Sequence, residues 1–146
     1  MSLEILQTLW RWIDRVVDSK EGLARRCIKG RWLWYRVKLP RWLGVFAFYL
    51  TETTIRQRPD LPIEVYQLVA AASITIATKM WEDDDYFSVK DVREHLPRLF
   101  TKRAIIDTEW AVLEAVDYDL QEASRRCFFQ NQKDLVLSDI RALRED

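Results

Sequence analysis

The sequence contains few side chains that could carry out catalysis. Its single histidine, His95, lies two residues before a proline, and Cys27 and Cys127 are far apart in the chain. Three adjacent aspartates at 83–85 could hold a divalent cation, but neighbouring loop aspartates without further ligands are more often simply hydrated. Neither a nucleophile with its base nor a set of metal ligands is recognisable. We therefore expect no enzyme, no catalytic residue, no metal site and no cofactor.

Two charged residues stand out because of the positions they occupy. Glu109 lies four residues after Ile105 and four before Leu113, so on a helix it projects from the apolar stripe. Burying a carboxylate there costs on the order of a few kcal/mol unless it meets a partner. Lys79 ends the most apolar stretch of the chain, where a lysine favours the helix dipole and can extend to water. For Glu109 the pattern leaves two explanations open, namely a buried ion pair and a role at an interface.

The stretch around which we expect the chain to fold is LPIEVYQLVAAASITIATKMW, residues 61–81. Between Val65 and Ala77 it carries no charge, and a helix that is apolar on every side belongs inside a bundle. Polar residues interrupt it too often for a membrane span, and its alanines suit close helix packing. These features predict an all-α fold around a buried central helix at about 63–81.

Capping residues and helical periodicity predict the elements on either side of this helix. Ser2 and Thr101 are suitable N-caps, and Pro40 can open a helix. The segment Ala24–Lys38, ARRCIKGRWLWYRVK, has neither a clean helical nor a clean strand period, and we assign it to a helix from its context. The other predicted helices cover approximately residues 2–17, 40–57, 89–96, 102–116 and 135–143.

Composition restricts the classes of partner. With 23 basic and 23 acidic residues in 146, the net charge favours neither a membrane nor nucleic acid, and we expect no small-molecule substrate. The charge is unevenly spread, because residues 11–58 hold twelve basic and four acidic residues whereas residues 59–94 hold three and eight. Two cysteines and no secretory signal predict an intracellular protein of the nucleus or cytoplasm, without disulfides.

Residues 68–120 resemble the cyclin box. The run LVAAASITIATKMWEDDDYFSVKDV is followed by IIDTEWAVLEAVDYDL, which matches the family pattern E-x-x-x-L-x-x-x-x-F/Y-D-L. Upstream, LGVFAFYLTET is similar to the family's L-x-x-A-V-x-Y-I-D-R, with Thr51 in place of the aspartate. RRCIKGRWL can be aligned with the family's M-R-A-I-L-V-D-W-L. The pattern positions in the second run are occupied by Glu109, Leu113, Tyr118, Asp119 and Leu120.

The resemblance implies a five-helix cyclin box over residues 23–130, with an extra N-terminal helix over 1–22 and a C-terminal helix or tail over 131–146. It also implies a heterodimer in which the chain binds and activates a cyclin-dependent kinase by positioning the kinase's C helix. The drift from the family pattern suits a divergent, single-box member, such as a viral or protist cyclin. Lys79 and Glu109 would sit together on the kinase-facing surface and bond to backbone near the kinase's C helix. The apolar contact positions around them would be Ile76, Met80, Trp110, Leu113, Tyr118 and Leu120.

Cyclins that recruit substrates use apolar residues of the M-R-A-I-L segment. Here Arg25 and Lys29 replace its methionine and leucine, so the resemblance implies at most a degenerate substrate-docking groove, formed by Ile28, Trp32 and Gln67.

Two alternative functions remain open. The Arg- and Trp-rich residues 25–42 could bind phosphates and stack on bases, as in an adaptor of a transcription complex. Core packing of these tryptophans is the ordinary explanation, and for that reason we do not expect nucleic acid as a partner. A cyclin-fold protein could also bind a kinase without activating it, or activate it without activation-loop phosphorylation.

Overall fold

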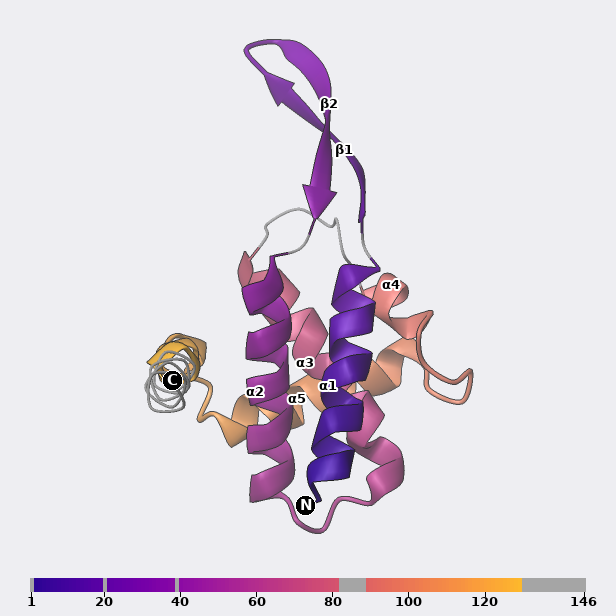
Figure 1. Ribbon diagram of the computed structural model, residues 1–146, viewed down its shortest axis with the longest axis vertical. Helices are drawn as coiled ribbons and strands as arrows, with labels where there is room; N and C mark the ends of the chain where they lie inside the picture. The colour runs from indigo at the N-terminus through magenta and orange to yellow at the C-terminus, as the bar shows by residue number, and fades with distance from the viewer. Residues whose placement is uncertain (1, 20, 39, 82–88, 130–146) are drawn as a thin grey trace, which may run out of the picture.

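The computed structural model describes residues 2–19, 21–38, 40–81 and 89–129. Figure 1 shows a bundle of helices from which a two-stranded hairpin projects. The predicted all-α fold around a buried central helix is confirmed, with one local exception in the hairpin. Residues 120–129 are helical, and the other elements are α1 (Leu3–Asp18), β1 (Glu21–Ile28), β2 (Arg31–Lys38), α2 (Arg41–Gln57), the 3₁₀ turn η1 (Ile63–Val65), α3 (Tyr66–Trp81), α4 (Val89–Arg93) and α5 (Lys102–Ala115).

Helix α3 is the centre of the bundle. Every residue from Leu68 to Thr78 is buried, and α1, α2, α4 and α5 all pack against this helix. Two of its buried hydroxyls are satisfied within the helix, since Ser73 donates to the carbonyl of Val69 at 2.9 Å and Thr78 to that of Ile74 at 2.7 Å. Polar residues can therefore lie in the core without loss of hydrogen bonds. None of the described helices is both long and apolar enough to cross a membrane.

Helix α1 begins at the predicted cap, where Ser2 Oγ accepts a hydrogen bond from the amide of Ile5 at 3.3 Å. Its apolar stripe is buried against α2 and α3, with Ile13 and Val16 fully inaccessible to solvent. The N-terminal helix therefore belongs to the same core as the helices that follow it.

Helix α5 also begins at its predicted cap, because Thr101 Oγ1 accepts from the amide of Ala104 at 3.1 Å. The chain leaves this helix through two consecutive left-handed residues, Asp117 (φ 53°) and Tyr118 (φ 57°). A tyrosine with positive φ is uncommon and strained. The turn allows Asp119 to cap the helical residues 120–129, since its Oδ1 accepts from the amide of Glu122 at 3.0 Å.

The helix predicted over residues 24–38 is wrong. β1 and β2 pair antiparallel from Glu21 opposite Lys38 to Ile28 opposite Arg31. The two residues between them, Lys29 (φ 51°) and Gly30 (φ 77°), both have positive φ, as a type I′ hairpin turn requires. Aromatic and β-branched residues then favour the extended conformation of β2. This turn chemistry and strand propensity outweigh the helical context on which the assignment rested.

Apart from α4, the remaining predicted helix boundaries agree with the structure within one or two residues where it describes them. Helix α4 ends at Arg93, three residues earlier than predicted, although Leu96 is still buried against the core. The weak capping box at Ser88, the aspartates at 83–85 and the helix predicted over 135–143 lie outside the described residues.

Candidate functional site

Lys79 and Glu109 form an ion pair across the contact between α3 and α5. The ammonium nitrogen of Lys79 lies 3.0 Å from Oε1 and 2.9 Å from Oε2 of Glu109, so both carboxylate oxygens accept from it. The two side chains differ in exposure, with 61% of the lysine and 12% of the glutamate accessible to solvent. The pair thus has a buried acidic end and an exposed basic end.

A third residue, Thr75, holds the carboxylate from inside the bundle. Its Oγ1 lies 2.6 Å from Glu109 Oε1 and 2.7 Å from the carbonyl oxygen of Ala72. A hydroxyl has only one proton to donate, and the charged, closer carboxylate is the stronger acceptor. Sequence reasoning missed Thr75, although it precedes Lys79 by four residues and so shares its face of α3.

This geometry answers the question that the sequence left open for Glu109. The glutamate, itself nearly buried, takes part in an ion pair within the chain, and its carboxylate accepts hydrogen bonds from Thr75 and Lys79. Lys79 remains largely exposed, so its ammonium is accessible from the surface. The pair therefore forms a polar, internally fixed point on the outside of the bundle.

Several large apolar side chains on α3, on α5 and just after α5 remain exposed. Met80 is 40% exposed, Trp110 63% and Tyr118 62%. Ile106, which sequence reasoning did not select, is 38% exposed and lies four residues before Trp110, on the same face of α5. We refer to these four residues together with Lys79 and Glu109 as the α3–α5 surface.

The other predicted contact residues are less accessible. Leu113 and Leu120 are half-buried and pack against the core from its edge. Ile76 is only 4% exposed, so it belongs to the hydrophobic core and is not accessible at the surface.

The predicted groove of Ile28, Trp32 and Gln67 is not formed. Ile28 and Trp32 lie on the hairpin, which projects from the end of the bundle where α1 ends and α2 begins (Figure 1), whereas Gln67 lies at the start of α3. The prediction failed because it placed a helix where the chain forms strands. Gln67 instead lines a surface pocket of about 450 Å³ between α1 and α3, together with Glu4, Ile5, Thr8, Leu9, Trp12, Ile63 and Tyr66.

The histidine and the two cysteines, the only candidates for catalysis in the sequence, lie apart from one another. His95 is exposed, and its Nε2 lies 3.3 Å from Ser19 Oγ, which connects the end of α4 to the end of α1. Cys27 is exposed on the hairpin, whereas Cys127 is buried, and burial raises the pKa of its thiol to about 11. Within the described residues, no three histidine, cysteine or acidic side chains lie close enough together to hold a metal ion.

Comparison with known proteins gives one match. Residues 26–121 match the family model described as the N-terminal domain of cyclins. Searches of curated proteins and of solved structures find no significant match.

Proposed function

Because the chain belongs to the cyclin family, whose members are regulatory proteins rather than enzymes, we propose that it is the regulatory subunit of a cyclin-dependent kinase. It binds the kinase through the α3–α5 surface as a heterodimer and activates it. By the same proposal the protein acts in the nucleus or cytoplasm. The observation that carries the proposal is the pair of Lys79 and Glu109, which is fixed from within and whose members are each followed in the chain by an exposed apolar residue, Met80 and Trp110.

The composition of this surface supports binding to a protein. Burying the exposed parts of Met80, Ile106, Trp110 and Tyr118 against a partner would remove a large apolar area from water. Aromatic residues beside a charged group that needs no further neutralisation are typical of interface hot spots. The exposed indole of Trp110, one residue after Glu109, is the strongest candidate anchor.

The apolar residues would supply most of the binding free energy, and the ion pair would fix the orientation of the partner. A lysine ammonium has three N–H donors, and Lys79 directs two of them to the carboxylate oxygens of Glu109. The remaining donor can bond to a backbone carbonyl of the partner. Because Thr75 and Lys79 hold Glu109 in place, little side-chain entropy is lost when the partner binds.

Activation would follow from rigid positioning. A cyclin-dependent kinase requires its C helix to be placed so that its glutamate pairs with the lysine that orients ATP. A rigid helical bundle that contacts this mobile helix favours the active position of the C helix over the inactive one. The chain supplies the shape and the contacts, and the kinase supplies the chemistry.

The experiment that tests this proposal combines the protein with a panel of purified cyclin-dependent kinases. Complex formation is measured by pull-down and activation by phosphotransfer to a generic substrate. We expect at least one kinase to be both bound and activated. Binding without activation would support the non-activating alternative, and absence of binding across the panel would contradict the proposal.

The pocket beside Gln67 supports a second function, the docking of a peptide. Its walls include the apolar Ile5, Leu9 and Trp12, and Glu4 contributes a carboxylate. This composition suits a peptide with an apolar side chain close to a cationic one. We expect peptides selected from a random library to combine these two features. They should not bind the Thr8→Arg variant, whose larger side chain fills the pocket. Equal binding to the variant would exclude this site.

A further inference from the structure

The hairpin formed by β1 and β2 concentrates positive charge. Between residues 21 and 38 the only acidic residue is Glu21. Because the whole chain has a formal net charge of zero, the remaining residues carry a net acidic charge. An uneven charge of this kind attracts an anionic partner to one part of the molecule. The basic residues of the hairpin are Arg25, Arg26, Lys29, Arg31, Arg36 and Lys38.

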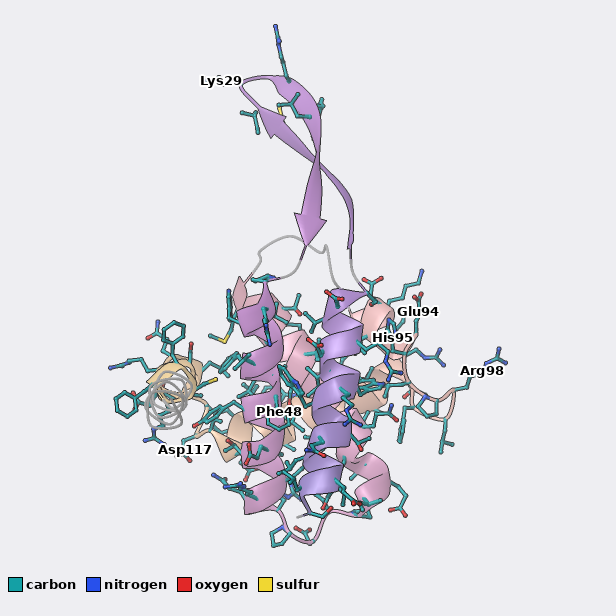
Figure 2. The ribbon with its side chains drawn as sticks, viewed as in Figure 1. Lys29, Phe48, Glu94, His95, Arg98 and Asp117 are labelled. Atoms are coloured by element: carbon teal, nitrogen blue, oxygen red, sulfur yellow. The ribbon has the colours of Figure 1, made fainter. Side chains whose placement is uncertain are left out.

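The hairpin that bears these residues extends away from the bundle. Figure 1 shows the two strands extending beyond the ends of α1 and α2, and Figure 2 shows Lys29 at the tip, pointing away from the helices. Arg31, the first residue of β2, is exposed, and Trp32, the second, is 60% exposed. Core packing, the ordinary reason for tryptophans in this segment, does not apply to Trp32.

We propose that this hairpin binds single-stranded nucleic acid. Lysine and arginine side chains bind phosphates and release counterions, which provides affinity that does not depend on sequence. An exposed indole between basic residues can stack on an unpaired base, whose face is accessible only in a single strand. In the register of the hairpin, Arg25 lies opposite Trp34, and Arg31 directly precedes Trp32, so basic and aromatic positions are neighbours across the two strands and along β2.

The aromatic residues distinguish this partner from an acidic protein. Electrostatic attraction alone would serve a stretch of aspartates or glutamates as well as a phosphate backbone, whereas stacking requires a planar base. The proposal does not depend on the kinase-binding proposal, because it uses none of the residues of the α3–α5 surface.

The test measures fluorescence anisotropy of a labelled 20-nucleotide poly(dT) strand with the full chain. A 20-base-pair duplex, unlabelled polyglutamate and heparin serve as comparisons. We expect tight binding at low salt and a loss of affinity of roughly tenfold or more between 50 and 200 mM salt, since several phosphates are neutralised. The single strand should bind more tightly than the duplex, and polyglutamate should compete poorly.

Two hairpin variants separate charge from stacking. Lys29→Asn with Arg31→Gln removes two charges, and asparagine suits the left-handed position of the turn. We expect about tenfold weaker binding and a less steep salt dependence, by roughly 0.7 in logarithmic slope for each lost phosphate contact. Trp32→Val retains strand propensity and should weaken binding about tenfold through lost stacking.

Lys90→Gln with Arg98→Gln is the matched control, because it removes two exposed charges outside the hairpin. Affinity should stay within about twofold, and all three proteins should keep the melting temperature of the wild type. Equal weakening by the control, effective competition by polyglutamate, preference for the duplex, or no binding at low salt would each overturn the proposal.

Discussion

Lys79 and Glu109 form a bidentate ion pair whose two members lie in different environments. The lysine side chain is 61% exposed and the glutamate side chain 12%, with nitrogen-to-oxygen distances of 2.9 and 3.0 Å. In a solvated pair, the Coulomb attraction contributes little to stability. Here the buried carboxylate also accepts from Thr75, so the bundle itself fixes one end of the pair. This asymmetry allows the structural and the binding roles of the site to be tested separately.

Thr75→Val should lower the free energy of unfolding by about 1–2 kcal/mol, because it leaves a nearly buried carboxylate oxygen without one of its donors. Urea denaturation measures this change. Thr78→Val is the matched control, since the Thr78 hydroxyl bonds only to the Ile74 carbonyl of its own helix. We expect the control to lose clearly less stability. Equal losses in the two variants would show that Thr75 does not hold Glu109.

Tyr118→Gly should affect stability and binding in opposite directions. Glycine relieves the positive φ of 57°, so the free energy of unfolding should stay unchanged or rise by up to about 1 kcal/mol. Kinase affinity should fall, because the exposed ring is lost from the α3–α5 surface. Asp117→Gly relieves the same backbone strain at the adjacent residue and should leave affinity unchanged. Loss of stability in Tyr118→Gly would mean that the ring serves the fold rather than a partner.

Cys127 should remain unreactive in the folded protein at pH 8, whereas the exposed Cys27 is alkylated by iodoacetamide. Burial raises the pKa of the Cys127 thiol from 9.0 to about 11. The thiol therefore ionises at lower pH in the unfolded chain than in the folded protein, so its contribution to stability is lost as the pH rises through about 9 to 11.

Mass spectrometry of alkylated protein with and without urea identifies the reactive cysteine. Comparison of urea denaturation for the wild type and Cys127→Ala isolates the thiol's part of the pH dependence. Alkylation of Cys127 in the folded state, or the same pH dependence in both proteins, would show that this thiol is not held in the core.

The sequence predicted those parts of the fold that depend on local patterns. The charge-free run between Val65 and Ala77 is long enough that only a buried helix can accommodate it, and α3 is that helix. Ser2 and Thr101 are confirmed as caps, because an N-cap hydrogen bond involves residues two or three positions apart.

The hairpin was missed because its main sequence signal is a two-residue turn and not a periodic pattern of apolar residues. Lysine is not among the residues that mark a type I′ turn most clearly, so the Lys29–Gly30 pair gave a weak indication. Because arginines are frequent in this segment, the alternation of apolar and polar residues expected of a strand is not apparent. The clearest available signal was the run of aromatic and β-branched residues from Trp32 to Val37, which favours a strand.

The sequence singled out Lys79 and Glu109 as unusual charges. The stripe on α5 identified Glu109 as a charge in need of a partner, but only the resemblance to cyclins placed Lys79 beside it, because contacts between helices do not follow from local patterns. For the same reason Thr75 was missed and Ile76, which is buried, was assigned to the contact surface. Ile106 could have been found from its spacing of four residues from Trp110.

The most direct test measures the affinity of the chain for a kinase that the panel identifies as bound, with and without the indole of Trp110. Trp110→Ala should weaken binding by about 2 kcal/mol or more, as expected for a hot spot, and Lys79→Ala should do the same. Because the Trp110 side chain is 63% exposed, its variant should keep the wild-type melting temperature. Leu3→Ala, an exposed apolar residue on α1, should bind like the wild type. Unchanged affinity in Trp110→Ala, or equal weakening in Leu3→Ala, would contradict kinase binding through the α3–α5 surface.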